Sequence, residues 1–161
     1  YVKGLGMLGR ICYVAGLSLW TMLCLPTTPV ELAAGYSFPM LTSAALSAVA
    51  KTVGSLTALL IGRRFLRPVI SRWSSHRENG AFHRHLRREL RDNPIQTMSI
   101  LRAAPLPTPF KLYGLSLFPA ELVPFQTYAT IAILFNSLWS LVWSLTGSSA
   151  SSLQDAMAGS G

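Results

Sequence analysis

Three long apolar runs constrain the fold of this chain more than any other feature of its sequence. Residues 11–25 and 122–147 carry no charged side chain. Residues 39–62 carry one, Lys51. A helix that crosses the hydrocarbon core of a bilayer needs about 20 mostly apolar residues. The second and third runs reach this length, and the first reaches it if it extends back toward Gly4, so we expect a polytopic all-α membrane protein.

Composition agrees with a membrane protein and excludes a disulfide-stapled one. Charged residues make up 12% of the 161 residues, which is about half the usual share in a soluble domain. Cys12 and Cys24 both lie in the first run, and one helix cannot bring them together. The first run also lacks the small-residue cleavage site of a signal peptide, so we predict a retained span.

The net charge of +8 is concentrated in one connection between apolar runs. Residues 63–94 hold nine arginines and three acidic residues, and so supply +6 of it. A basic connection that is poor in acids marks the cytosolic side of a membrane. Nucleic-acid binding is excluded because the charge lies beside apolar runs and no RNA- or DNA-reading motif accompanies it. We expect this linker to bind anionic lipid.

Apolar side chains recur at helical spacing within this linker. Phe65, Val69 and Trp73 belong to a first stripe, and Phe82 and Leu86 begin a second. Stripes flanked by arginine are typical of helices that lie in the headgroup plane. A connector packed against the end of the helix bundle would show the same pattern. The sequence leaves both interpretations open.

Two proline-broken segments have the same order of prolines and glycines, and the matching residues lie 79 to 81 positions apart. Each has a Leu-Pro-Thr start, then a glycine, then Phe-Pro, at Phe38-Pro39 and at Phe118-Pro119. Matching Pro- or Gly-broken segments in two halves of a membrane protein indicate an internal repeat around a binding site. The residues that we assign to the two hairpin turns are Pro26, Pro29 and Gly35, then Pro105, Pro107, Pro109 and Gly114.

These segments predict two re-entrant hairpins at membrane depth. Prolines remove backbone donors and prevent a continuous helix, and non-helical backbone is tolerated in a bilayer only inside protein or beside water. An ordinary loop outside the membrane is the alternative for each segment. The sequence does not settle whether the second half is inverted or parallel to the first.

Charged residues in or beside the apolar runs are candidates for a transport pathway. A charge at the bilayer centre costs at least about 2.5–3.5 kcal/mol, so it needs a partner, water or an interface. Lys51 lies beside a ridge of small residues that begins at Ala50 and Gly54, and we expect it to face the bundle interior. If the halves meet, Glu31 and Arg102 can neutralise each other. The pathway residues that we assign are Glu31, Lys51, Arg102 and Lys111; Lys111 and Glu121 could instead reach an interface.

The residues needed for enzyme chemistry are missing from the sequence. The three histidines, His76, His83 and His85, lie among arginines that would repel a metal ion. We find no nucleophile–base constellation, no phosphate-cradling glycine loop and no paired carboxylates. We therefore expect no enzyme activity, no cofactor and no metal site.

Four blocks of the chain resemble, in order, those of one membrane-protein family. Residues 25–38 (LPTTPVELAAGYSF) resemble its first block, and residues 54–63 (GSLTALLIGR) its glycine-rich span. Residues 102–110 (RAAPLPTPF) resemble its Arg-x-x-Pro-x-Pro signature, and residues 146–155 the stretch after its last core helix. Together the blocks are similar to the VTT-domain family, the DedA and SNARE-associated Golgi protein superfamily, and closest to its eukaryotic Golgi-type branch.

The resemblance implies two opposed re-entrant hairpins in a helical bundle, and either lipid scrambling or proton-coupled transport in endomembranes. Glu31 and Arg102 fall where bacterial members place functional acidic and basic residues. Thr108 stands where those members often have a second arginine. Ser43 stands where they tend to have a second acid. These departures favour passive lipid movement over proton-driven antiport.

We therefore expect residues 1–147 to form a VTT-like membrane domain, with residues 63–94 as its amphipathic cytosolic linker. Residues 148–161 are rich in Ser, Gly and Ala and are predicted to be a flexible polar tail. The leading function is phospholipid scrambling or transport through a central polar cavity, in Golgi, ER or related endomembranes or in a plastid membrane. The alternative is a membrane-trafficking scaffold of the SNARE-associated type, whose basic linker recruits partners.

Overall fold

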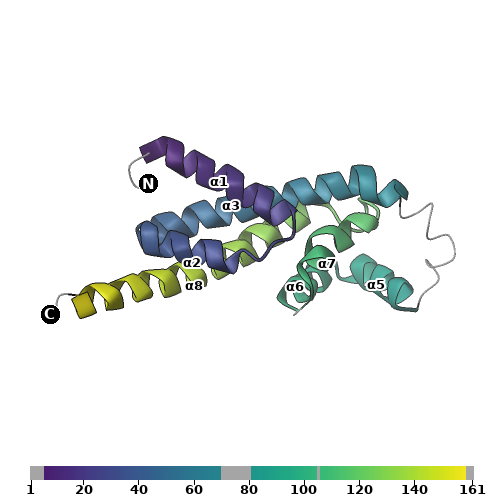
Figure 1. Ribbon diagram of the computed structural model, residues 1–161. Coiled ribbons are helices and arrows are strands. Elements are labelled where there is room, and N and C mark those ends of the chain that lie inside the picture. Colours follow the sequence, from purple (N-terminus) through teal and green to yellow (C-terminus); the bar gives the residue numbers. More distant parts are fainter. Residues whose placement is uncertain (1–5, 70–80, 105, 159–161) are drawn as a thin grey trace. The chain divides into compact units, whose positions relative to one another are not determined.

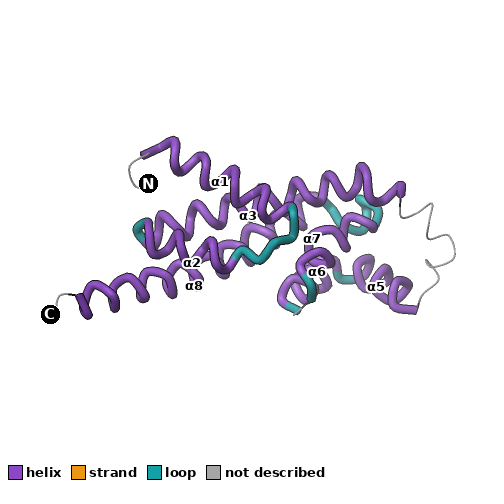
Figure 2. The backbone as a smooth tube through the Cα atoms, in the orientation of Figure 1, coloured by secondary structure: helices purple, strands orange, loops and turns teal. Residues whose placement is uncertain are grey.

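A computed structural model describes residues 6–69, 81–104 and 106–158 of the chain (Figure 1). Within these ranges the chain is helical, and short loops join the helices (Figure 2). Figure 2 shows no strand in the described part. The prediction of an all-α protein is confirmed for this part of the chain.

The chain divides into two compact units, which we describe separately. Unit 1 comprises residues 1–54 and 133–161, and unit 2 comprises residues 55–132. Helices α3 (Met40–Ile61) and α8 (Phe125–Ala158) each contribute to both units. The other elements of unit 1 are α1 (Gly6–Met22) and α2 (Thr28–Ser37). The other elements of unit 2 are the π-helical turn η2 (Gly62–Leu66), α5 (Ala81–Asp92), α6 (Pro94–Ala103), α7 (Thr108–Tyr113) and the 3₁₀ turn η3 (Gly114–Leu117).

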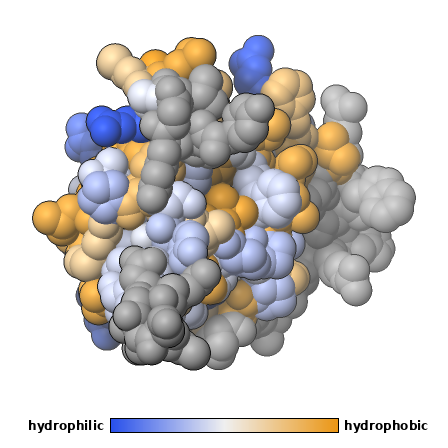
Figure 3. Space-filling view, turned by 60° about the vertical axis from the view of Figure 1, so that its left-hand side comes forward, coloured by the Kyte–Doolittle hydropathy of each residue, from blue (hydrophilic) through white to orange (hydrophobic). Residues whose placement is uncertain are grey.

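Two helical stretches are long and apolar enough to cross a membrane, Met40–Val69 and Phe125–Ser152. Only 44% and 28% of their most apolar windows are buried inside the protein. The core helix of a soluble protein would be mostly buried, whereas these helices leave large side chains such as Leu41 and Leu134 exposed. Hydrophobic residues, orange in Figure 3, accordingly lie on the surface near the edges of that view. Lipid is the solvent in which such surfaces are stable.

The first apolar run forms α1, which has 17 residues. This is below the roughly 20 residues that a span needs, and only the two stretches above meet that length within the described residues. The expectation that residues 11–25 form a third span stays a prediction.

Helix α1 ends in a hydrogen-bonded cap. The N–H of Leu25 donates to the carbonyl of Trp20, and the N–H of Cys24 donates to that of Thr21. This pair of bonds defines a Schellman motif, in which one residue adopts the left-handed conformation. Cys24 takes that conformation, with φ 58°. The indole of Trp20 also donates to the carbonyl of Pro26 at 3.0 Å. The cap therefore ends α1 directly before the first proline-broken segment.

The two proline-broken segments have similar local structures. Helices α2 and α7 both carry proline in the first turn, Pro29 and Pro109, where the missing backbone donor costs least. Each segment ends at a phenylalanine with extended backbone, Phe38 and Phe118, directly before a proline. Pro107 caps α7 at its N-terminus, and Pro105 lies outside the described residues. The re-entrant course of both segments and the internal repeat stay predictions.

The predicted ridge of small residues on α3 is buried. Ala50 and Ala58 are fully buried, and Gly54 and Gly62 are buried as well. A Cβ at Gly54 would lie 2.7 Å from the carbonyl oxygen of Ser18. Helix α1 can therefore approach α3 closely only because residue 54 has no side chain.

Helix α8 continues to Ala158, through most of the segment predicted to be a flexible tail. The hydroxyls of Ser148 and Ser149 donate to the carbonyl of Leu145 at 2.9 Å. Those of Ser151 and Ser152 donate to the carbonyl of Ser148. Bonds to the preceding turn let a serine-rich stretch stay helical, which the composition alone did not indicate.

In the basic linker, the second predicted stripe lies on α5. Leu90 is 1% exposed and Leu86 is half-buried. Helix α5 packs against α6. The first stripe is described up to Val69, and Trp73 lies outside the described residues.

Candidate functional site: a buried charge pair among hydroxyls

A carboxylate at the start of α2 is fully buried in unit 1. Glu31 lies in the first turn of the helix, where the helix dipole stabilises a negative charge. Its backbone N–H donates to the carbonyl of Thr27 at 3.0 Å, so the helical hydrogen bonding begins directly after Pro26. The exposed fraction of Glu31 is 0%. The proline-started turn therefore places an acid in the interior of unit 1.

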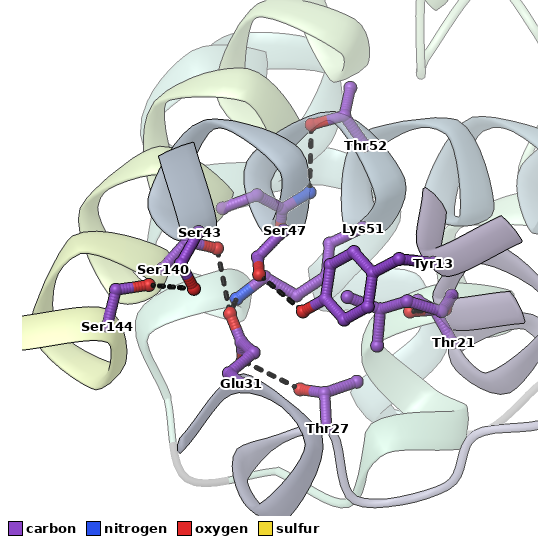
Figure 4. A network of polar contacts seen from close by, with 12 residues as sticks. Tyr13, Thr21, Thr27, Glu31, Ser43, Ser47, Lys51, Thr52, Ser140 and Ser144 are labelled. Carbon is purple, nitrogen blue, oxygen red and sulfur yellow. Dashed lines mark hydrogen bonds and ion pairs between the residues drawn. The ribbon is translucent and has the colours of Figure 1, made fainter. Parts of the chain in front are cut away.

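Lys51 from α3 neutralises this acid. The distance from Lys51 Nζ to Glu31 Oε1 is 2.8 Å, and their side chains are 9% and 0% exposed. Ser140 Oγ donates to the same oxygen at 2.8 Å, and Thr27 Oγ1 donates to Oε2 at 3.2 Å. Two buried charges are tolerated only when they are paired and further hydrogen-bonded. Figure 4 shows these side chains converging on Glu31.

Rows of serine extend this site along two helices. Ser43, Ser47 and Lys51 follow one another at spacings of four on α3, and all three are buried. Such spacing places side chains on one face of a helix. On α8, Ser140 and Ser144 repeat the pattern. Ser144 Oγ donates to Ser43 Oγ at 3.1 Å, so the two rows meet (Figure 4).

Helix α1 closes a further side of the polar network. The hydroxyls of Tyr13 and Ser47 share a hydrogen bond of 2.7 Å. The hydroxyl of Ser18 donates to the carbonyl of Ala50 at 2.9 Å. The ring of Tyr13 packs edge-on against Phe38, with centroids 6.1 Å apart. The half-buried Tyr13 thus makes an apolar contact through its ring and a polar contact through its hydroxyl.

Unit 2 contains a second charged site, and it is cationic. The guanidinium carbon of Arg102, in the last turn of α6, lies 5.0 Å from the centroid of the Tyr128 ring. This distance is within the range of a cation–π interaction. Tyr128 is 1% exposed, and its hydroxyl donates to the carbonyl of Ser55 at 3.5 Å. Lys111 of α7 is half-buried and lines the same cavity as Arg102.

The Gly62–Arg63 pair, at the start of η2, has a structural role in unit 2. The Nη2 group of Arg63 donates to the backbone carbonyl of Val123. A Cβ at Gly62 would lie 2.6 Å from the Cβ of Ser116, so glycine permits the close approach of η3. Arg63 thus holds the loop before α8, because it satisfies a backbone carbonyl that lies before the first residue of that helix.

The predicted pathway residues fall into two pairs. The structure brings Glu31 and Lys51 together in unit 1, and it places Arg102 and Lys111 on one cavity of unit 2. The predicted neutralisation of Glu31 by Arg102 would join residues of different units and stays a prediction. Glu121 is exposed, which agrees with the alternative that this charge lies at an interface.

The hydroxyl residues of the network were not among the residues predicted from the sequence. Ser43 was singled out only as a missing acid, although it bonds to Ser144 in the buried network. The signal that could have found these residues is the spacing of four from Ser43 through Ser47 to Lys51. In a run this apolar, polar residues that share one helical face indicate a buried polar contact.

A comparison with protein-family models identifies the family. The VTT domain family model matches residues 25–149, which include both charged sites and both proline-broken segments. Searches among curated proteins and solved structures found no match. The match covers more than half of the chain and agrees with its apolar, helical structure. The chain therefore belongs to the VTT-domain family of membrane proteins, the DedA and SNARE-associated Golgi protein family.

Proposed function

We propose that this protein moves phospholipids across the bilayer, through a polar path that includes the buried network of unit 1. One observation carries the proposal: a Glu31–Lys51 ion pair, surrounded by hydroxyls, lies inside helices whose outer surfaces are apolar. A zwitterionic headgroup contains one cation and one anion. It could exchange with the ion pair while the acyl chains stay in lipid.

Passive movement is favoured over proton-driven transport. The position at which bacterial relatives tend to have a second acid is Ser43, and its hydroxyl accepts a hydrogen bond from Ser144. Thr108 replaces a second arginine at the start of α7. With one carboxylate and one lysine, the network of unit 1 can exchange partners without a change in net charge.

The proposal includes a re-entrant course for the two proline-broken segments, related by an internal repeat. Their support is the shared local structure, namely a proline in the first turn and an extended phenylalanine before the next proline. A break of this kind in a membrane needs protein or water around it. Cysteine accessibility at Thr28 and Thr108 tests this course, because a re-entrant turn should be reached by small reagents and not by large ones.

A scrambling assay tests the function. The full chain is reconstituted with a fluorescent phosphatidylcholine, and the fraction quenched from outside is followed at matched density of folded protein. Glu31→Gln should slow lipid movement at least about tenfold, because it leaves Lys51 buried without its carboxylate, at a cost above the roughly 1.4 kcal/mol of a tenfold change. Arg102→Ala should slow it as well, because it removes a cation that the proposed path offers to the phosphate of a headgroup. Wild-type rates in both variants would reject the mechanism.

The control separates charge from folding. In Glu31→Gln/Lys51→Met both charges are removed, so no unpaired ion is left in the interior. We expect this variant to fold and still to scramble slowly, because the partners for a headgroup are gone. A folded, charge-free variant with full activity would show that the ion pair is structural.

A trafficking scaffold is the second candidate, and the arginines of α5 favour it. Arg84, Arg87, Arg88 and Arg91 are exposed at spacings of three and four, and they line a groove of about 390 Å³. This arginine row could hold anionic lipid or acidic segments of trafficking proteins. Arg87→Ala/Arg88→Ala should weaken binding to phosphatidylserine vesicles and leave scrambling intact. If the double variant loses scrambling instead, the row belongs to the transport path.

The proposal also includes a location in Golgi or ER membranes. Its support is the similarity of the blocks to the Golgi-type branch. Imaging of a fluorescent fusion beside Golgi, ER and plastid markers tests the assignment. Exclusive plastid signal would move the proposed function to that organelle.

A further inference from the structure

Unit 2 contains a cavity of about 380 Å³ between α6, α7 and η3, with Leu86 of α5 at its edge. This volume is in the range of small-molecule sites, about 300–1,000 Å³. Leucine, phenylalanine and proline side chains form most of its lining, including Leu101, Leu106 and Phe110. The cavity therefore offers an apolar surface that could hold part of an acyl chain.

Two cationic side chains interrupt this apolar lining. Arg102 and Lys111 both face the cavity, and among the described residues that line it none is acidic. The position of Arg102 is restricted by the ring of Tyr128, 5.0 Å away. A cation held beforehand by packing binds an anion without losing its own conformational freedom. The charge of the cavity is thus complementary to an anionic ligand.

The combination selects one class of ligand. A water-soluble anion would make no use of the apolar walls, and a neutral lipid would make no use of the two cations. Phosphate oxygens form strong charge-assisted hydrogen bonds with arginine and lysine. We propose that this cavity binds a phospholipid with an anionic headgroup, its phosphate at Arg102 and Lys111 and its chain along the leucines. The proposal rests on the proposed function and narrows it, because both cations belong to the assigned pathway.

Gly114 provides a way to fill the cavity without disturbing the fold. It lines the cavity, and a Cβ at this position would meet no atom within 4 Å. Its backbone is right-handed helical, φ −57° and ψ −42°, which any residue can adopt. A phenylalanine at residue 114 should therefore occupy the space of the ligand.

Native mass spectrometry of the full chain in detergent tests the proposal. The probes are dioleoyl phosphatidate, dioleoyl phosphatidylcholine and dioleoylglycerol, with glycerol 3-phosphate as the competitor without chains. We expect phosphatidate to bind about tenfold more tightly than phosphatidylcholine, as one additional charge-assisted contact would give. Equal binding of dioleoylglycerol, or full competition by glycerol 3-phosphate, would overturn it.

Three variants locate the binding. Lys111→Gln should reduce phosphatidate affinity about tenfold, and Gly114→Phe should abolish it. Arg10→Gln, on α1, removes the same charge outside the cavity and should bind like the wild type. Unchanged binding in both Lys111→Gln and Gly114→Phe would show that phosphatidate binds elsewhere, and this overturns the proposal.

The scrambling assay separates the failure of this proposal from that of the proposed function. If Gly114→Phe loses phosphatidate and still moves phosphatidylcholine at the wild-type rate, the cavity is a binding site and not part of the path. If binding is as expected and the wild type does not scramble, the proposed function fails and the site stands. If the wild type scrambles lipid but does not bind phosphatidate, the proposed binding site is wrong and the proposed function is unaffected.

Discussion

The two proline-broken segments share a backbone pattern and differ in what surrounds it. At Gly35, in unit 1, a Cβ would lie 2.7 Å from the carbonyl oxygen of Ser144, so α2 is packed closely on α8. At the matching Gly114, in unit 2, a Cβ would meet nothing within 4 Å. The first segment holds a buried ion pair, and the second borders an open cavity with two cations. Two segments with the same pattern of prolines and glycines thus border a tightly packed site in unit 1 and an open cavity in unit 2.

This difference separates two kinds of sequence information. Prolines and the residues beside them determine where helices begin and end, and that information is local. The chemistry of each site depends on which distant side chains are brought to it. Ser140 and Lys51 reach Glu31 from other helices, whereas Arg102 and Lys111 come from neighbouring elements of one unit.

The largest expected effect comes from breaking the closed site. Glu31→Gln leaves Lys51 buried without its carboxylate, which should lower the free energy of unfolding by about 3–5 kcal/mol. Unfolding in detergent, followed by circular dichroism during a denaturant titration, measures the change. The control is Glu31→Gln/Lys51→Met, which should recover most of the loss, because a buried pair replaced by uncharged groups is often neutral. Equal losses in both variants would mean that the pair itself contributes the stability.

Alanine substitutions of Gly35 and Gly114 test whether the first segment is packed more closely than the second. Gly35→Ala forces a methyl group against the backbone of α8 and should cost about 1–3 kcal/mol. Gly114→Ala meets no neighbour and should stay within about 1 kcal/mol of the wild type, and could raise stability by restricting the unfolded chain. Thermal unfolding of the two variants in the same detergent gives the comparison. A larger loss at residue 114 would reverse the assignment of closed and open segments.

Much of the fold could be predicted from the sequence, and less of the site. Apolar runs predicted the two long apolar helices. The proline clusters predicted interruptions of helical structure, and α2 and α7 begin at these clusters. Glu31 and Lys51 were singled out by their cost in an apolar environment, but their pairing was not predicted, because it depends on how α2 and α3 pack. Ser140 and Ser144 resemble any serine in the sequence, and only the fold shows that they are buried.

The backbone conformation directly before the two proline-broken segments differs as well, and a substitution of Cys24 tests this difference. The first segment follows a left-handed residue, Cys24 with φ 58°, whereas α6 ends at Ala104 with extended backbone, ψ 145°. A left-handed conformation costs about 1–2 kcal/mol in residues with a side chain, and glycine avoids it. Cys24→Gly should therefore raise stability by up to about 1 kcal/mol. Cys12→Gly, inside α1, should lower it by a similar amount, so a loss in both variants would contradict the cap.

The smallest effect is expected at an exposed ion pair of the basic linker, which sharpens the contrast with the buried pair. Arg88 Nε lies 3.8 Å from Asp92 Oδ2, and the two side chains are 81% and 55% exposed. Water screens such a pair, so Asp92→Asn should change the free energy of unfolding by less than about 0.5 kcal/mol. The same substitution removes an acid beside the arginine row, so binding to phosphatidylserine vesicles should rise slightly at low salt and converge with the wild type at high salt. Co-sedimentation at two salt concentrations measures this. A loss of stability as large as that of Glu31→Gln would show that the linker pair is buried in the folded protein in its membrane, and the distinction between the two pairs would then be wrong.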